Sequence, residues 1–351
     1  MSTPEHFDFP ASFVLQNICD ITGSEFDLKR SPHEDMANEE ATKWFQRFNV
    51  YDAKKAKRWL KAGRFDVFAA LSFPEADQSH LETCLMFFFW AFSTDDLSDE
   101  GDLQRKPDSV DSGHDASRRI LNDPNAPQPR AEESPYAAML WDLLRRIRST
   151  GTEGTARRFI QAYLDWSASQ IQQATNRKDD RLPPIEEFIL MRRATIGAAL
   201  VEAMVEYSLD VDLPDYVFED PIFIAMSKAI SDIMTWPNDL CSFNKEQADG
   251  DYQNLVCVLQ KAHKLTLQEA VDMLTQMIHN RVQDYASLKK RLPSFGPEVD
   301  AALSKYHTAL EHFTQGCVVW YWSSPRYFRD VEPLGKKEVV IELFPSTIDV
   351  N

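Results

Sequence analysis

The chain has 351 residues, with 38 Lys and Arg against 55 Asp and Glu, which gives a formal net charge of −17. This balance argues against a nucleic-acid partner and against docking on anionic lipid, because both need a basic surface. The hydrophobic fraction of 43% is large enough for a sizeable core.

Cysteine usage and the ends of the chain bear on the compartment. The five cysteines lack CxxC pairing, which indicates free thiols in a reducing compartment. The first residues show no secretory pattern. The densest apolar window, 84–92, is nine residues long, whereas a membrane span needs roughly 20. A cytoplasmic protein with no membrane partner is expected.

The sequence predicts one all-α domain over 35–328 between two terminal segments. Residues 1–34 predict an irregular N-terminal arm and 329–351 a C-terminal tail, where 339–341 could be a strand or an extended strap. Residues 100–133, rich in Gly, Asp, Ser and Pro, predict a long surface loop. Apolar residues at three- and four-residue steps predict the helices, over about 35–48, 52–61, 79–95, 135–149, 153–175, 184–208, 219–246, 266–291 and 297–322.

A first acidic motif, Asp95-Asp96-x-x-Asp99, follows the apolar window. On a helix Asp95 and Asp99 share a face, while Asp96 is rotated by about 100°. Two carboxylates on one face suit a hard cation such as Mg2+, and their mutual repulsion predicts a positive group between them. Phe88 and Phe92 lie on the face of Asp95, which favours a buried aromatic wall over a solvated acidic helix end.

A second motif begins at Asn238. Asn238, Ser242 and Glu246 recur at four-residue steps, so on a helix they form one row of three oxygen ligands about 12 Å long. Such a row can hold one Mg2+ and leave room for phosphate oxygens. Lys245 adds a cation that could pair with a diphosphate. The alternative is a polar helix end that runs into a loop.

These two motifs resemble those of the class I terpene cyclases, and among them the basidiomycete-type fungal sesquiterpene synthases. In that family an aspartate-rich motif on one helix is joined by N-D-x-x-S-x-x-x-E on another. The family also has a diphosphate-sensing Arg, which matches Arg192, 46 residues before Asn238. Its terminal Arg-Tyr pair matches Arg326-Tyr327, which begins 80 residues after Glu246.

The resemblance implies a single class I terpene synthase-like helical bundle around an apolar cavity. It implies three Mg2+ ions, two bound by Asp95 with Asp99 in support and a third bound by Asn238, Ser242 and Glu246. The resemblance assigns the diphosphate to Arg192, Lys245, Arg326 and Tyr327. A carbonyl-bearing effector at a helix break would be Ile196 or Gly197, and both stay open.

The chemistry implied is the Mg2+-dependent ionisation of farnesyl diphosphate, cyclisation of the carbocation to a sesquiterpene hydrocarbon or alcohol, and release of diphosphate. Asp95, Arg192, Arg326 and Tyr327 would be catalytic, and no nucleophile is needed. A closed apolar pocket would protect the cation, and aromatic faces can stabilise it. Candidate rings, each of which could instead be core packing, are Phe65, Phe68, Phe88, Phe92, Trp320 and Trp322. Of these, Phe88, Phe92 and Trp322 are expected to contact substrate.

Other interpretations are weaker. A chain-elongating prenyl transferase usually has two Asp-rich motifs, and the pair Asp179-Asp180 does not fit that pattern. A monoterpene synthase remains open because cavity volume is not encoded locally. A non-enzymatic helical scaffold would not need Arg192 and Arg326 at these offsets. The helices allow a monomer or a homodimer.

Overall fold

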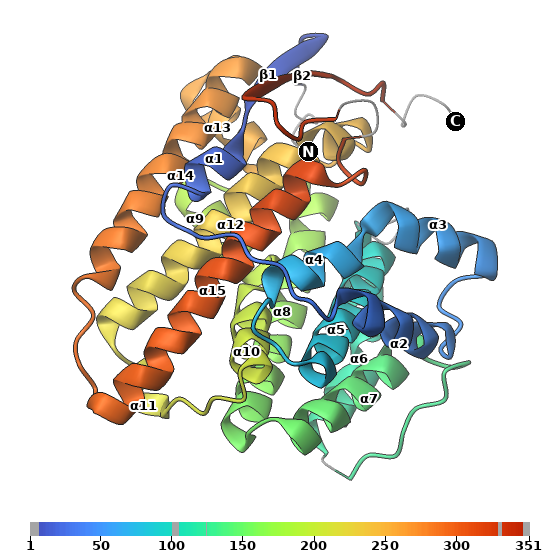
Figure 1. The fold of residues 1–351 in the computed structure, drawn as a ribbon. Coiled ribbons are helices and arrows are strands. Elements are labelled where there is room, and N and C mark those ends of the chain that lie inside the picture. Colours follow the sequence, from blue (N-terminus) through green and yellow to red (C-terminus); the bar gives the residue numbers. More distant parts are fainter. Residues whose placement is uncertain (1–6, 100–104, 124, 329–331, 347–351) are drawn as a thin grey trace.

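The protein is described by a computed structural model that places residues 7–99, 105–123, 125–328 and 332–346, without the side chains of 97–99. The fold is an all-α bundle with one small two-stranded sheet (Figure 1), which confirms the predicted fold class. Within these described residues no helix is long and apolar enough to cross a membrane.

The elements follow one another along the chain with short connections. The helices are α1 (Ile18–Thr22), α2 (Glu34–Gln46), α3 (Ala53–Gly63), α4 (Phe65–Ser72), α5 (Gln78–Asp99), α6 (Pro107–Asn122), α7 (Pro135–Thr150), α8 (Glu153–Lys178), α9 (Ile185–Thr195), α10 (Ala198–Ser208), α11 (Asp215–Phe218), α12 (Pro221–Ala248), α13 (Leu255–His263), α14 (Leu267–Lys289) and α15 (Pro297–Ser323). The strands are β1 (Ser12–Gln16) and β2 (Glu338–Glu342).

Two groups of helices share the core. The helices α12, α14 and α15 lie side by side, while α2, α5, α6, α7 and α8 form the other half (Figure 1). Helix α4 packs against both α5 and α15, and α10 packs against α8, α5 and α15. These two shorter helices therefore join the halves and help to set the width of the space between them.

Helices α5 and α12 are buried on nearly all sides, which explains their apolar composition. Pro237 lies inside α12. Because proline has no N–H and its ring crowds the preceding turn, it interrupts the hydrogen-bond ladder one residue before Asn238. Sequence reasoning did not use this signal.

The single helix predicted over 184–208 is wrong, because α9 ends at Thr195 and α10 begins at Ala198. Between them Gly197 has φ 76°, in the left-handed region. Glycine has no Cβ and adopts this conformation without strain, so the backbone can change direction there.

The predicted surface loop over 100–133 is also wrong in its middle, where α6 packs against α7 and α8. Pro107 occupies the first turn of α6, and Val110, His114, Ile120 and Leu121 are buried. Polar residues between these positions hid the pattern. Helices α4 and α13 were missed for a different reason: they are short and apolar on most sides, so they show no clear period.

The two ends of the chain meet in the sheet. Strand β1 pairs antiparallel with β2, with Val14 opposite Val340. This confirms a strand around 339–341 and corrects the N-terminal arm, which contains β1 and α1 instead of being irregular throughout. The segment after β2 is fixed to α12, because the side chain of Asn244 donates to the Glu342 carbonyl at 2.9 Å and accepts from the Phe344 N–H at 2.8 Å.

The contact between α4 and α15 gives a stability prediction. A Cβ added at Gly316 of α15 would lie 2.5 Å from the Leu71 carbonyl oxygen. We expect Gly316→Ala to lower the free energy of unfolding by about 1–3 kcal/mol, as overpacking does, measured by denaturant unfolding.

The matched control is Gly113→Ala in α6, where an added Cβ meets nothing within 4 Å. Removing backbone freedom there should raise the free energy of unfolding by about 0.5–1 kcal/mol. Equal effects of the two substitutions would contradict the close helix approach.

Candidate functional site

The two sequence motifs lie on opposite walls of one cavity of about 190 Å3. Asp95, near the C-terminal end of α5, lines one side, and the second half of α12 supplies Asn238, Ser242 and Glu246 on the other. The side chain of Asp99 lies outside the described residues. The fold therefore brings together groups that are more than 140 residues apart in the chain.

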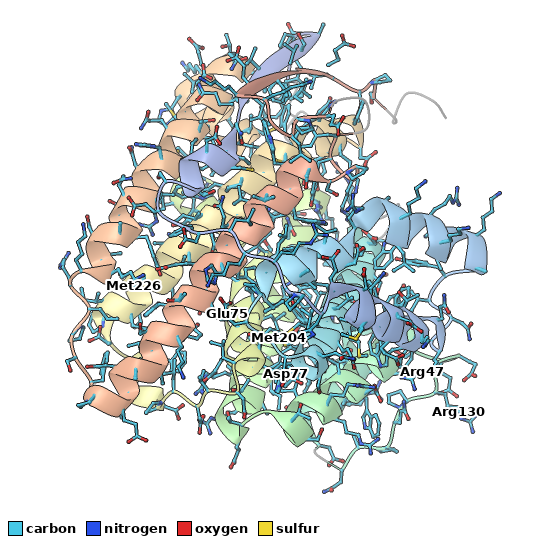
Figure 2. All side chains as sticks on the ribbon, viewed as in Figure 1. Arg47, Glu75, Asp77, Arg130, Met204 and Met226 are labelled. Carbon is cyan, nitrogen blue, oxygen red and sulfur yellow. The ribbon has the colours of Figure 1, made fainter. Side chains whose placement is uncertain are left out.

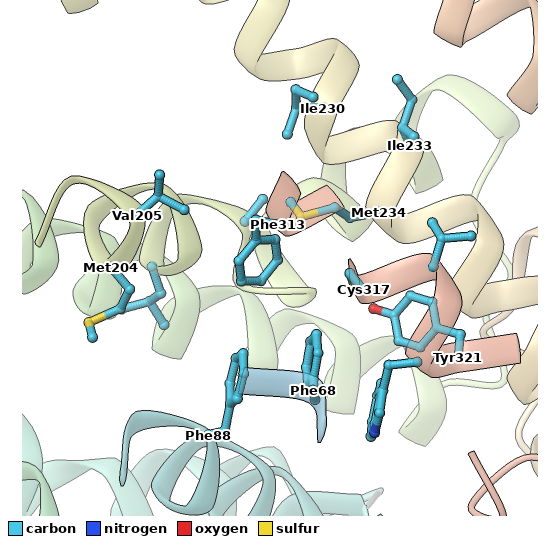
Figure 3. Packing of buried hydrophobic residues seen from close by; sticks show 14 of the residues in the cluster. Phe68, Phe88, Met204, Val205, Ile230, Ile233, Met234, Phe313, Cys317 and Tyr321 are labelled. Atoms are coloured by element: carbon cyan, nitrogen blue, oxygen red, sulfur yellow. The ribbon is translucent and has the colours of Figure 1, made fainter. Parts of the chain in front are cut away.

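The floor of the cavity is aromatic and aliphatic. Phe68 and Phe88 stack with ring centroids 4.1 Å apart and planes within 4° of each other. Figure 3 shows these two rings across the cavity from Phe313 and Cys317. Phe92 completes this wall below Asp95. Both Phe88 and Phe92 therefore face the cavity, and their contact with a substrate stays a prediction.

The structure does not place Trp322 at the cavity, where sequence reasoning expected it. Its indole N–H donates to the Pro333 carbonyl at 3.0 Å, and its ring packs against Phe328. The neighbouring residue Tyr321 lines the cavity instead, because the rotation of α15 about its axis is not encoded in local spacing. Trp320 stacks behind Phe68 at 4.4 Å, so it supports the wall from outside.

Arg192 lies at the rim, almost fully buried. Its guanidinium donates to the Asp239 carboxylate, to Asn238 Oδ1 at 3.2 Å and to Thr195 Oγ1 at 3.1 Å. Burial by itself lowers the pKa of Arg192, but the Asp239 carboxylate outweighs it and raises the pKa. The side chain is thus a permanent cation next to the α12 row.

Arg326 forms the second cationic corner. Its Nη2 donates to Asp96 Oδ1 at 2.8 Å, and the indole N–H of Trp59 donates to Asp96 Oδ2 at 2.7 Å. Burial disfavours the charged carboxylate, yet Arg326 holds the pKa of Asp96 below its usual value. The predicted positive group is therefore present, but its partner is Asp96, the residue that sequence reasoning had turned away from the site.

Tyr327 and Lys245 complete the predicted set at the cavity. The Tyr327 hydroxyl accepts from Asn238 Nδ2 at 3.3 Å. Both residues line the cavity together with Arg192 and Arg326. Cations from α9, α12 and the segment after α15 thus gather over the aromatic floor.

Sequence reasoning missed the segment 249–254, which returns from the end of α12 to the site. Asn254 is fully buried and donates through Nδ2 to Glu246 Oε2 at 2.9 Å and to the Asp239 carbonyl at 2.7 Å. Its Oδ1 accepts from the Val256 N–H as the N-cap of α13. An Asn just before an apolar run is an N-cap signal, so the sequence did hold a pointer to this residue.

The same segment carries Asp251, which accepts from Arg177 of α8 at 2.6 Å, and both side chains line the cavity. Burial raises the pKa of Glu246 to about 7, and the carboxylates of Asp251 and Asp239 add to the shift. A carboxyl group in such surroundings favours a nearby cation. Arg177 and Asp251 had no recognisable spacing relative to either motif.

The break between α9 and α10 borders the cavity through Thr195, Ile196 and Gly197. The Thr195 carbonyl accepts from the indole of Trp166 at 3.1 Å and from Gln170 Nε2 at 3.3 Å, both on α8. The break is therefore held in place by α8 on one side and by Arg192 on the other.

The donor set fits a hard divalent cation. Among the described residues, no three Asp, Glu, His or Cys side chains gather closely enough to hold a metal by themselves. Cation ligands would have to include the Asn238 and Ser242 oxygens beside Glu246, with Asp95 opposite. Oxygen ligands with few formal charges match the preference of Mg2+, which keeps waters and takes phosphate oxygens as further ligands.

Comparisons with known proteins agree with this geometry. A family profile described as "Terpene synthase family 2, C-terminal metal binding" matches residues 86–284. The chain is 30% identical to sesquiterpene synthase Agr1 of Cyclocybe aegerita, over 93% of this chain and 92% of the relative. It is also 30% identical to alpha-muurolene synthase of Coprinopsis cinerea, over 94% of this chain and 78% of the relative.

Solved structures show the same fold. The SVS_A2 protein from ancestral sequence reconstruction superposes with a TM-score of 0.76 at 24% identity, covering 90% of this chain and 90% of that one. Germacradien-4-ol synthase from Streptomyces citricolor gives a TM-score of 0.74 at 22% identity, over 84% of this chain and 96% of its own.

The contacts of Asn254 yield a prediction about cation binding. We expect Asn254→Ser to weaken Mn2+ binding in the presence of inorganic pyrophosphate by about 10–100-fold, because an outer-shell partner of a ligand is lost. Serine still caps α13, so the melting temperature should stay close to that of the wild type. Electron paramagnetic resonance of free Mn2+ measures the affinity.

The control is Asn280→Ser on the exposed surface of α14, which should leave the affinity unchanged. An Asn254→Ser protein that binds Mn2+ as tightly as the control would remove the positioning role of Asn254.

Proposed function

The chain belongs to terpene synthase family 2, and from this premise we propose that it is a sesquiterpene synthase that ionises farnesyl diphosphate and cyclises the resulting carbocation. The observation that carries the proposal is one cavity with a polar, cationic rim and an aromatic floor. The rim suits a diphosphate and the floor suits a fifteen-carbon chain. A cytoplasmic location and the choice between monomer and homodimer stay predictions.

The rim would hold the leaving group. Arg192, Lys245, Arg326 and Tyr327 come from three segments and line the same cavity, so they can donate to several phosphate oxygens at once. Charge on these oxygens grows as the carbon–oxygen bond breaks, and fixed donors in a water-poor site stabilise that charge strongly. The two arginines are already oriented by Asp239 and Asp96, so little reorganisation is required.

Divalent cations would sit between the two walls. We propose Asp95 with Asp99 as the ligands on α5, and Asn238, Ser242 and Glu246 as those on α12, for three Mg2+ ions in all. When bound, Mg2+ supplies Lewis-acid neutralisation of the diphosphate charge. Asn254 would fix the Glu246 carboxylate in this arrangement.

The floor would protect the carbocation. Phe88 and Phe92 present aromatic faces or edges to the cavity below Asp95, and ring faces attract a cation through their quadrupole. Apolar side chains around them exclude water, which would otherwise quench the cation.

The helix break would link the rim to the floor. Arg192 donates to Thr195 Oγ1 directly before Ile196, so a movement of the guanidinium toward a diphosphate would be transmitted to the break. This favours the carbonyl of Ile196 as the effector, with Gly197 supplying the left-handed conformation that ends α9.

The direct test is incubation with farnesyl diphosphate and Mg2+, followed by gas chromatography of extracted volatiles. A sesquiterpene hydrocarbon or alcohol is expected. Geranyl and geranylgeranyl diphosphates, run in parallel, test the chain length. Absence of any terpene product from all three substrates would overturn the proposal.

Loss of the proposed cation ligands should act on turnover and not on folding. We expect Asp95→Asn and Glu246→Gln each to lower kcat by about 100-fold or more, because each removes charge from the Mg2+ sites. The melting temperature should change little, since both residues line a cavity. Glu298→Gln on the exposed start of α15 is the matched control; full activity in either site variant would remove that residue from the mechanism.

Arg326 should matter through its charge and its forked shape. We predict that Arg326→Ala raises KM for farnesyl diphosphate by about 10-fold or more, because a charge-assisted contact to phosphate is lost. Arg326→Lys should recover part of the affinity, since lysine keeps the charge without the fork. Steady-state kinetics and pyrophosphate titration measure both. Unchanged KM in Arg326→Ala would argue against diphosphate binding here.

A further inference from the structure

Residues 47–64 are strongly basic in an acidic protein. They contain seven Lys and Arg against Asp52 alone, while the whole chain carries −17. Helix α3 itself has no acidic residue. Five of these cations are exposed and form no ion pair with any other described residue; they define the basic surface and are Lys54, Lys57, Arg58, Lys61 and Arg64.

The basic surface is not explained by helix stability. Lys54, Lys57, Arg58 and Lys61 follow one another at helical spacings of three or four, where like charges repel by a few tenths of a kcal/mol per pair. A solvated helix face normally mixes both signs. The side chains of α3 extend away from the bundle (Figure 2), and Arg47 lies beside them at the end of α2.

The inner face of α3 is attached to the site. Trp59 donates to Asp96, the partner of Arg326. The Trp59 ring lies 4.6 Å from Phe65, and Phe65 lies 4.8 Å from Phe92, which lines the cavity. The basic surface is thus about one helix diameter, 10–12 Å, from the wall of the site. This distance is comparable with the Debye length of about 10 Å at 0.1 M ionic strength.

We infer that the basic surface of α3 captures the diphosphate group of the incoming isoprenoid and steers it to the mouth of the cavity. The inference rests on the proposed function, because it takes an isoprenoid diphosphate as the ligand. A chain of net charge −17 repels an anion at long range. A local run of cations beside the mouth reverses that field where the substrate must enter.

An anionic lipid surface is the competing partner, and α3 fits it less well. Interfacial helices bury an apolar face in the lipid. The large apolar side chains of α3, Trp59 and Leu60, are partly buried against the protein core instead. The exposed face offers charge without an apolar anchor.

The test compares two triple charge reversals that change the net charge equally. One is Lys54→Glu, Lys57→Glu and Lys61→Glu on α3. The other is Lys228→Glu, Lys290→Glu and Lys305→Glu, three exposed positions on α12, at the end of α14 and on α15, at the opposite end of the bundle (Figure 1). The kcat/KM for farnesyl diphosphate is measured against ionic strength at fixed free Mg2+.

We expect the α3 variant to lower kcat/KM by about 10-fold or more at about 0.01 M ionic strength, where the Debye length is about 30 Å. Its kcat should equal that of the wild type, and the difference should vanish at about 1 M, where screening is strong. Lys→Gln at the same three positions should give a smaller loss, and the control triple variant should follow the wild type.

Equal salt dependence in the wild type and the α3 variant would overturn the inference. So would loss of binding to phosphatidylserine vesicles with unchanged kcat/KM, which would assign the surface to lipid. If the wild type turns over no prenyl diphosphate, the proposed function fails separately. The association rate of Mg2+ pyrophosphate, followed by stopped-flow tryptophan fluorescence, then tests the surface, and a rate insensitive to charge reversal contradicts it.

Discussion

Two buried ion pairs determine how this site works. Arg192 is held by Asp239 and Arg326 by Asp96, and each carboxylate is itself fixed by a second donor, the Leu255 N–H or the Trp59 indole. A buried charge without a partner would be costly. Each pair therefore keeps a cation at the rim while its own carboxylate remains satisfied, and the helices that carry these residues must keep their spacing.

Helix α12 connects this rim to the rest of the molecule. One face presents Asn238, Ser242 and Glu246 to the cavity, while Asn244 on the other face binds the backbone after β2. The segment after the helix then returns Asn254 to Glu246. A single helix thus carries the cation ligands and is held from both sides by parts of the chain remote from the motif.

The aromatic floor follows a different principle, because it depends on shape and on the exclusion of water. Phe68 stacks between Phe88 and Trp320, so one wall of the cavity is a rigid layer with only its inner rings accessible. Close packing of this layer requires α4 to approach α15 at Gly316. The helix contact far from the rim therefore sets the contour that a hydrocarbon chain would meet.

The sequence by itself determined the all-α class and the two oxygen-bearing motifs, because helical periodicity and i, i+4 spacing are local properties. It also placed Phe88 and Phe92 on the face of Asp95. Tertiary structure decided that Asp96 and not Asp95 pairs with Arg326, that Trp322 turns into the core, and that Asn254 and Arg177 reach the cavity. It also decided that α6 lies within the predicted loop. These outcomes depend on the rotation and distance of helices far apart in the chain, and no local spacing encodes either.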